Sequence, residues 1–363
     1  MALEHQPDFR PSFHCDHPAF WAGSPESVYR QVDAVRRGDV TEIATSPGGR
    51  PIHLVAYGEP EPFTSRANFN SAVGARDITA YADKSARTRP VVFLLGPVHG
   101  EETNGSTGCV NMMSILETGA DLRGKEWPEL RELADTCRVL IVPLANPDGT
   151  ARFTPGCFVG CSPYEVRYWA QGTWSDTRLC EWPDCKAQHP MRGPNTGFLG
   201  AYFNDDGINP MHDEFFAPMG PEAPAILDIA RREAPELICG LHGHPSAVAV
   251  LEPAYVPMYI KRECAEFARR LKETYSAAGI PFTEPFTPGC DGDQPPGPPF
   301  NLTSALFHVS GAMSFTLECP VGFAGDNALL CTHEEILEMQ LVLYGECLRF
   351  AHERLQAWPQ AVC

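Results

Sequence analysis

The sequence predicts a single α/β domain whose mixed, mostly parallel sheet is covered by helices on both faces. Three observations support this fold class. Predicted strands alternate with predicted helices along the chain, as in sheets with helical crossovers. Two strands are continuous apolar runs, which indicates burial on both faces. The chain has 363 residues, of which 43% are hydrophobic and 20% charged, so it can fill a large core.

The N-terminal part begins with an arm and continues with a strand pair. Residues 1–25 lack periodicity and are predicted to form the arm, so that the domain comprises residues 26–363. Amphipathic spacing predicts a helix over 27–37. Apolar residues over 40–44 and 52–57, separated by a Gly-Gly turn, predict two strands.

The next part contains an insertion and the first βα unit. Residues 59–88 are polar and rich in turn residues, which predicts an insertion. The apolar run Val91–Leu95 predicts a buried strand. Helices are predicted over 103–117 and 129–136, and a second buried strand over 138–143.

A long irregular stretch separates the two halves of the domain. Residues 150–205 are aromatic and cysteine-rich, and they are too many for an ordinary connection, so we expect a second insertion with a functional role. The proline-rich residues 289–299 are expected to form a rim over the site. After residue 205 the patterns predict, in chain order, a helix over 222–232, a strand over 236–241, a helix over 259–278, a strand over 313–317 and a helix over 333–358.

The composition excludes several classes of partner. Asp and Glu outnumber Lys and Arg by 46 to 28, and the net charge of −18 would repel nucleic-acid phosphates. The apolar stretches are shorter than the roughly twenty residues of a membrane-spanning helix, and charged residues among the first twenty argue against a signal peptide. Fourteen cysteines then suggest a reducing compartment. We expect a cytoplasmic protein that binds neither nucleic acid nor membranes.

Potential metal ligands stand at the ends of three predicted strands. His99 and Glu102 follow the first buried strand, His242 follows a later one, and Glu318 ends a third. A His and a Glu three residues apart at a strand-to-helix turn can face one ion. A distant His completes a two-His, one-carboxylate set with an open position, which is typical of catalytic zinc. His244 is a competing ligand or a neighbour of the site, because residues two apart on a strand face the same side.

Five segments resemble, in order, those of the zinc carboxypeptidase family of metallopeptidases. The similarity runs from about residue 27 onward. Its LHGH sequence, residues 241–244, is nearest to the cytosolic carboxypeptidase branch. The five segments are residues 48–52 (GGRPI), 91–102, 146–149 (NPDG), 239–244 (CGLHGH) and 314–318 (SFTLE).

The resemblance implies a catalytic zinc centre. His99, Glu102 and His242 would bind one Zn²⁺ with water in the remaining position. Glu318 would be the general base that takes the proton of the water and the acid that passes it to the leaving nitrogen.

Two further catalytic groups of the family match less closely. The family uses an arginine downstream of the NPDG turn to stabilise the oxyanion, and here Arg167 is the candidate, with Arg152 and Arg192 as alternates. The family also has a tyrosine some twenty residues before its base. Residues 287–318 contain no tyrosine, and Phe300 and His308 are the available substitutes.

The substrate-binding segment departs from the family. There an Asn-Arg pair holds the C-terminal carboxylate of a peptide, whereas here Met211 and His212 stand in its place. A register shifted by two residues aligns Asn209 but supplies no arginine. We therefore expect His212, Asn209 and Arg192 to contact the substrate, with Arg178 as a further cation.

The missing arginine bears on specificity. A carboxylate held by His212 would bind best when the imidazole is protonated, so we expect its affinity to weaken as the pH rises through about 6.5. A small or modified peptide-like amide is then the expected substrate, rather than a long unmodified C-terminal tail.

Four cysteines lie in the second insertion. Cys157, Cys161, Cys180 and Cys185 could form a closed structural zinc site that staples an irregular segment. Their spacings are not those of CxxC knuckles, so free thiols and disulfides stay open as alternatives.

These features together predict a zinc-dependent hydrolase that cleaves an amide bond in a peptide or peptide-like small molecule. A zinc deacylase of small N-acyl amino acids, related to succinylglutamate desuccinylase and aspartoacylase, is one alternative. A non-catalytic binding protein of the same fold is another. The sequence does not set the oligomeric state.

Overall fold

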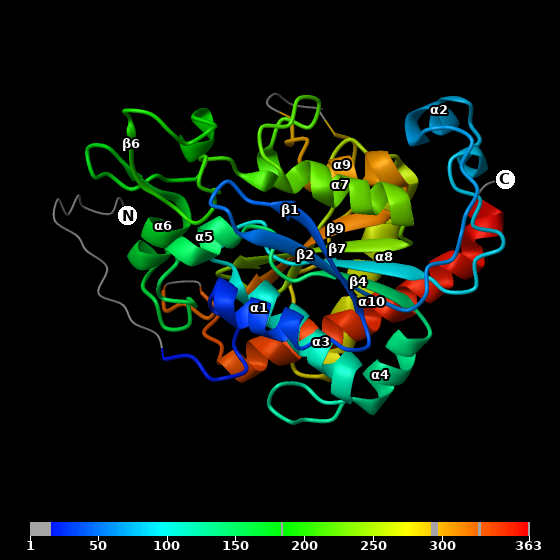
Figure 1. Cartoon of the computed structure of the whole chain (residues 1–363), viewed down its shortest axis with the longest axis horizontal. Helices are drawn as coiled ribbons and strands as arrows, with labels where there is room; N and C mark the ends of the chain where they lie inside the picture. Colours follow the sequence, from blue (N-terminus) through cyan, green and yellow to red (C-terminus); the bar gives the residue numbers. More distant parts are fainter. Residues whose placement is uncertain (1–15, 183, 292–296, 326–327, 362–363) are drawn as a thin grey trace.

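The computed structural model describes residues 16–182, 184–291, 297–325 and 328–361. A seven-stranded sheet has the order β1-β2-β4-β3-β7-β9-β8 (Figure 1). β3, β4, β7 and β9 are parallel to one another, whereas β1, β2 and β8 pair antiparallel with their neighbours. The predicted mixed, mostly parallel sheet is confirmed. Its strands are β1 (Asp39–Thr45), β2 (Pro51–Tyr57), β3 (Val91–Leu95), β4 (Arg138–Val142), β7 (Leu237–His244), β8 (Ala249–Leu251) and β9 (Met313–Pro320), and a separate pair comprises β5 (Gly172–Trp174) and β6 (Thr196–Leu199).

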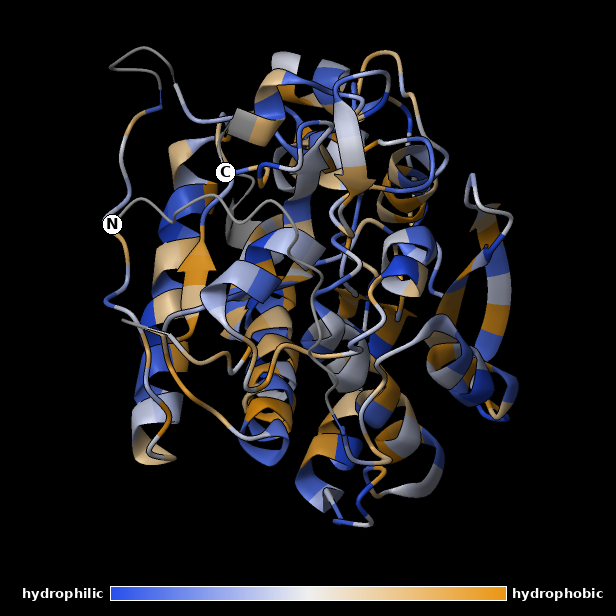
Figure 2. Cartoon of the chain, turned by 90° about the vertical axis from the view of Figure 1, so that its left-hand side faces the viewer, coloured by the Kyte–Doolittle hydropathy of each residue, from blue (hydrophilic) through white to orange (hydrophobic). Residues whose placement is uncertain are grey.

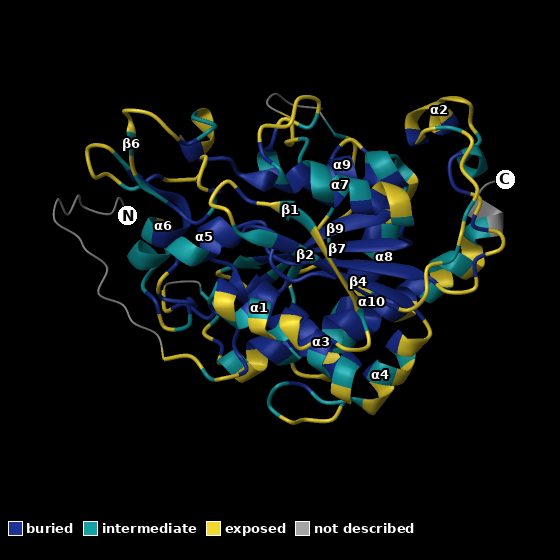
Figure 3. Cartoon of the chain, in the orientation of Figure 1, coloured by how far each residue is buried: buried dark blue, intermediate teal, exposed yellow. Residues whose placement is uncertain are grey.

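Helices cover both faces of the sheet and bury its central strands, whereas the edge strand β1 is largely exposed (Figure 3). On β3, Val92 and Leu94 belong to one core cluster, while Val91, Phe93 and Leu95 belong to the other, as the two-residue period of a strand requires. The first cluster includes residues of α1, α3, α4, α8 and α10, and the second includes residues of α7 and α9. The α-helices are α1 (Pro25–Asp33), α2 (Phe69–Gly74), α3 (Thr103–Thr118), α4 (Pro128–Asp135), α5 (Pro147–Arg152), α6 (Pro163–Gln171), α7 (Glu222–Glu233), α8 (Met258–Ala277), α9 (Leu302–Ser310) and α10 (His333–Ala361).

Helices such as α1 and α8 bury only one side, whereas α3 and α9 are buried along most of their length. Figure 2 accordingly shows hydrophobic and hydrophilic residues mixed along helical ribbons. None of the helices in the described part of the chain combines the length and the apolar character that crossing a membrane requires.

The structure contains five elements that the sequence did not predict. The NPDG segment, residues 146–149, is not an isolated turn but the start of the short helix α5. Asn146 caps this helix, and its side chain accepts a hydrogen bond from the backbone N–H of Gly149. The first insertion contains α2 and the 3₁₀ turn η1 (Ile78–Ala80). α9 and β8 carry too few periodic residues to be recognised in the sequence, and packing on the sheet stabilises them.

The second insertion has its own local structure. It contains α6, the β5–β6 pair and the 3₁₀ turn η2 (Asp184–Ala187), and the 3₁₀ turn η3 (Pro210–His212) follows it. Of the rim loop predicted over 289–299, residues 292–296 lie outside the described residues.

Candidate metal centre

The carboxyl ends of three adjacent parallel strands bring the candidate ligands to one edge of the sheet. His99 follows β3, and Glu102 immediately precedes α3. His242 lies on β7, and β7 pairs with β3 on one side and with β9 on the other. Glu318 of β9 is the register partner of His242. Ligands at the carboxyl ends of parallel strands are the expected arrangement for an open α/β sheet.

The three predicted ligands form a compact buried group. Nδ1 of His99 lies 3.0 Å from Oε1 of Glu102, and Nδ1 of His242 lies 3.0 Å from Oε2 of the same carboxylate. The three ligand atoms lie within 4.8 Å of one another. The three residues are only 4 to 5% exposed. Among the described residues, no other group of three or more His, Cys, Asp and Glu side chains lies close enough together to hold a metal ion.

The donor set fits zinc. Two imidazoles and one carboxylate are a ligand set that would hold a catalytic zinc ion. Oε2 of Glu102 is buried without a hydrogen-bond partner, because its 3.0 Å contact with Nδ1 of His242 lacks hydrogen-bond geometry. Such unsatisfied polar atoms are costly unless an ion occupies the space between the ligands.

The electrostatics of the group keep its carboxylate ionised. Burial raises the pKa of Glu102, but the charges of His99 and His242 outweigh this effect and bring the pKa to about 2. An ionised carboxylate between two imidazoles is the state that a divalent cation requires.

The NPDG segment holds the loop that carries His99. Asn146 donates from Nδ2 to the carbonyl of Val98, and the Thr150 hydroxyl donates to the carbonyl of Gly100. A Cβ on Gly100 would lie 2.2 Å from the backbone nitrogen of Thr150, so only glycine permits this approach. The NPDG motif therefore has a structural role, which is to hold the loop that carries the ligand His99.

Two other contacts orient the imidazoles. The Tyr202 ring stacks on His99 with 3.8 Å between ring centroids and 7° between planes. Asn104 donates to the carbonyl of His242. Neither Tyr202 nor Asn104 was singled out in the sequence, since neither belongs to a motif.

Glu318 is placed for proton transfer beside this group. It is partly buried, and burial raises its pKa to about 7, although the charge of His242 acts in the opposite direction. A carboxylate whose pKa lies near neutrality can accept a proton and release it again.

A cavity of about 190 Å³ adjoins the metal centre. Tyr202, which stacks on His99, forms part of its wall, and so do the predicted residues Asn209 and His212. The sequence did not point to the other polar lining residues, Lys186 and His189, because they stand in the irregular insertion.

The predicted arginines do not line this cavity in the described part of the chain. Arg167 forms an exposed ion pair with Glu181, with 3.2 Å between Nη1 and Oε1. Arg192 is exposed, and Arg178 pairs with Asp176. An oxyanion role for Arg167 stays a prediction.

Arg152, the other alternate, is half-buried and donates to the carbonyl of Phe203 and to the Asp205 carboxylate. These contacts belong to the packing of α5 against the segment that follows β6.

The remaining candidates have local partners. His244 lies at the end of β7, where Nε2 contacts the carbonyl of Ala247 at 2.8 Å. His308 contacts the carbonyl of Tyr255 in the same way, and its ring lies 5.6 Å from that of Phe300.

The predicted four-cysteine site is not formed by the described residues. Cys157, Cys161 and the pair Cys180 and Cys185 belong to three different hydrophobic clusters. Cys185 donates to Oε1 of Gln171. The four thiols are buried in three separate clusters, and the sequence spacing could not distinguish such buried cysteines from ligands.

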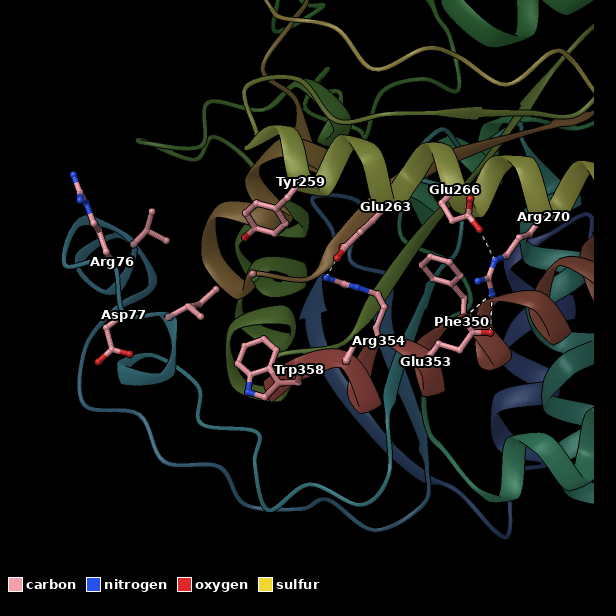
Figure 4. Close-up of a pocket in the computed structure, with 14 residues that line it drawn as sticks. Arg76, Asp77, Tyr259, Glu263, Glu266, Arg270, Phe350, Glu353, Arg354 and Trp358 are labelled. Carbon is pink, nitrogen blue, oxygen red and sulfur yellow. Dashed lines mark hydrogen bonds and ion pairs between the residues drawn. The ribbon is translucent and has the colours of Figure 1, made fainter. Parts of the chain in front are cut away.

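A larger cavity of about 390 Å³ lies between η1, α8 and the end of α10 (Figure 4). None of its lining residues belongs to the metal group. Two of its three arginines are engaged by carboxylates, Arg270 by Glu353 and Arg354 by Glu263. The smaller cavity is therefore the one associated with the chemistry.

Comparison with known proteins agrees with this assignment. The family model described as zinc carboxypeptidase, Peptidase_M14, matches residues 34–275, more than half of the chain. Mouse carboxypeptidase D is 30% identical over 216 residues, which cover 57% of this chain. The match spans only 13% of that relative's length.

Solved structures show the same fold. A metallo-carboxypeptidase from Burkholderia cenocepacia has a TM-score of 0.55 at 16% identity, with 90% of this chain and 69% of that chain covered. Bovine thrombin-activatable fibrinolysis inhibitor, solved with tick carboxypeptidase inhibitor, has a TM-score of 0.53 at 11% identity, with 92% and 98% covered.

Proposed function

Because the chain belongs to the zinc carboxypeptidase family Peptidase_M14, we propose that it hydrolyses an amide bond in a peptide or peptide-like molecule. The observation that carries this proposal is the buried group of His99, Glu102 and His242 with Glu318 beside it on the neighbouring strand. A binding protein of the same fold has no use for a carboxylate in that position.

In this proposal His99, Glu102 and His242 hold one zinc ion. Bound zinc supplies a Lewis acid for the scissile carbonyl and lowers the pKa of water in the open position. Asn104 and Tyr202 keep the two imidazoles in place, through the hydrogen bond to the backbone of His242 and the ring stack on His99.

Glu318 takes the proton of the attacking water and delivers it to the leaving nitrogen. Its pKa, raised to about 7 by burial, supports both halves of this transfer near neutral pH. The group of the substrate beyond the scissile bond enters the cavity beside Tyr202, where Asn209 and His212 contact it. Arg192 is exposed and lies outside the described lining of that cavity, so we assign it no contact.

The variant Glu318→Gln tests the proposal. It should retain zinc but lose about 10²- to 10⁴-fold in kcat, because the water loses its proton acceptor while the ligands are unchanged. Glu334→Gln, an exposed position at the start of α10, is the matched control. Turnover and zinc content are measured on a panel of short peptides and N-acyl amino acids.

The panel separates the alternatives. Cleavage of N-acyl amino acids alone would indicate the deacylase activity, and silence of the wild type on both classes would indicate a binding protein. Unchanged turnover in Glu318→Gln would show that another residue is the base.

A further inference from the structure

We propose that Lys186 is the residue that recognises a carboxylate on the substrate residue following the scissile bond, with His212 as its positioning partner. This inference rests on the proposed function and adds the residue that recognises the substrate charge in this chain. It comes from three observations on the cavity beside the metal centre.

The first observation is the contact between the two side chains. Nζ of Lys186 lies 2.6 Å from Nε2 of His212. An ammonium has only protons to donate, so the imidazole nitrogen is the acceptor and His212 is neutral in this pair. The hydrogen bond directs the ammonium to the wall of the cavity that both residues line.

The second observation is that Lys186 has no acidic partner among the side chains that the structure describes. The other four lysines each pair with a carboxylate: Lys84 with Glu236, Lys125 with Glu338, Lys261 with Asp291 and Lys272 with Glu284. Among the described residues, Lys186 contacts an imidazole and no carboxylate. In a chain whose acids outnumber its bases by 46 to 28, an unpaired cation in a cavity is available for an anionic ligand.

The third observation is the composition and place of the cavity. None of its described lining residues is acidic, and Asn209 and His189 add polar groups to the wall. Oδ1 of Asn209 accepts from the backbone of Met211, which leaves its amide NH₂ to donate. Tyr202 connects this wall to His99. A ligand anchored at Lys186 therefore has its amide bond on the side of the metal centre.

A carboxylate can come from the C-terminus or from an acidic side chain of the same residue. Both offer two acceptor oxygens to an ammonium and an amide donor. The experiment therefore uses two matched comparisons. A peptide acid is compared with its C-terminal amide, and a peptide ending in Glu is compared with one ending in Gln.

The variant Lys186→Met removes the charge and keeps much of the side-chain volume. Wild-type protein loaded with zinc should prefer the carboxylate substrate of at least one pair by about tenfold to a hundredfold in kcat/KM, the range of a charge-assisted hydrogen bond. Lys186→Met should abolish that preference, mainly through KM. Lys125→Met, at an exposed position, should keep it. Lys186→Gln guards against a folding defect, since it retains a polar group of similar length.

Equal cleavage of both members of both pairs by the wild type would overturn the inference, as would an unchanged preference in both Lys186 variants. A failure of the proposed function looks different, because no substrate would be cleaved. In that case a binding measurement decides. Calorimetric titration of the zinc-loaded Glu318→Gln protein with each acid and its amide should show the same Lys186-dependent preference. Equal binding of the acid and the amide would overturn the inference.

Discussion

The charge that a substrate meets beside the metal centre depends on the Lys186–His212 pair. Burial and the neighbouring ammonium lower the pKa of His212 to about 3, so the imidazole is neutral at any working pH. The structure therefore does not support the expectation that carboxylate affinity weakens as His212 loses a proton near pH 6.5. Burial also lowers the pKa of Lys186 from 10.5.

These directions give a pH prediction. The ratio of kcat/KM for a carboxylate substrate to that for its neutral counterpart should stay constant through pH 6.5. It should fall at a pH below 10.5, because Lys186 loses its proton earlier than an ordinary lysine. The ratio cancels ionisations common to both substrates, those of Glu318 included, and the other titratable groups of the wall are His189, Tyr202 and Cys185. A ratio that falls to half or less as the pH rises through 6.5 would show that a protonated histidine, and not Lys186, recognises the carboxylate.

At the scale of elements, buried ionic contacts tie separate segments to the sheet. Asp148 of α5 accepts from the Ser46 hydroxyl, from the backbone of Gly48 and from Arg50, which joins the NPDG segment to the β1–β2 turn. The same principle holds the first insertion. Lys84 and Arg87 at its end both pair with Glu236, which immediately precedes β7.

Glu236→Ala tests the importance of the second contact. The variant should lower the free energy of unfolding by about 3–5 kcal/mol, because two buried cations lose their carboxylate. The side chains of Lys84, Arg87 and Glu236 are only 2 to 4% exposed, so water cannot take the place of the lost carboxylate. Asp228→Ala breaks two exposed pairs on α7 and should cost less than about 1 kcal/mol. Urea titration measures both, and equal costs would contradict the argument.

At the scale of the whole molecule, the number of metal sites is the property to measure. The described residues form one group that could hold a metal, and the four cysteines of the second insertion are divided among three clusters. The prediction that residues 26–363 form one domain, with an arm before it, stays a prediction.

We predict one zinc per chain. The double variant Cys157→Ser, Cys180→Ser should keep it, whereas His99→Ala, Glu102→Ala should lose it, because that change removes two of the three ligands. Chelation of wild-type protein should lower Tm, since zinc binds the folded state. Emission spectrometry gives the stoichiometry, and a second zinc that disappears in the cysteine variant would restore the structural site.

The sequence by itself determined the fold class and the family, and it predicted the group of ligands that the structure brings together. Apolar strands, and the His and Glu residues just after them, are local patterns, and parallel strands place their ends at one edge. The tertiary structure alone decided the surroundings of that group. Lys186, Tyr202 and His212 meet across 26 residues of chain in a segment without periodicity, where long-range packing rather than local spacing sets which side chains touch. For the same reason the sequence could not show that the four cysteines lie in three separate clusters or that Arg167 forms a surface ion pair.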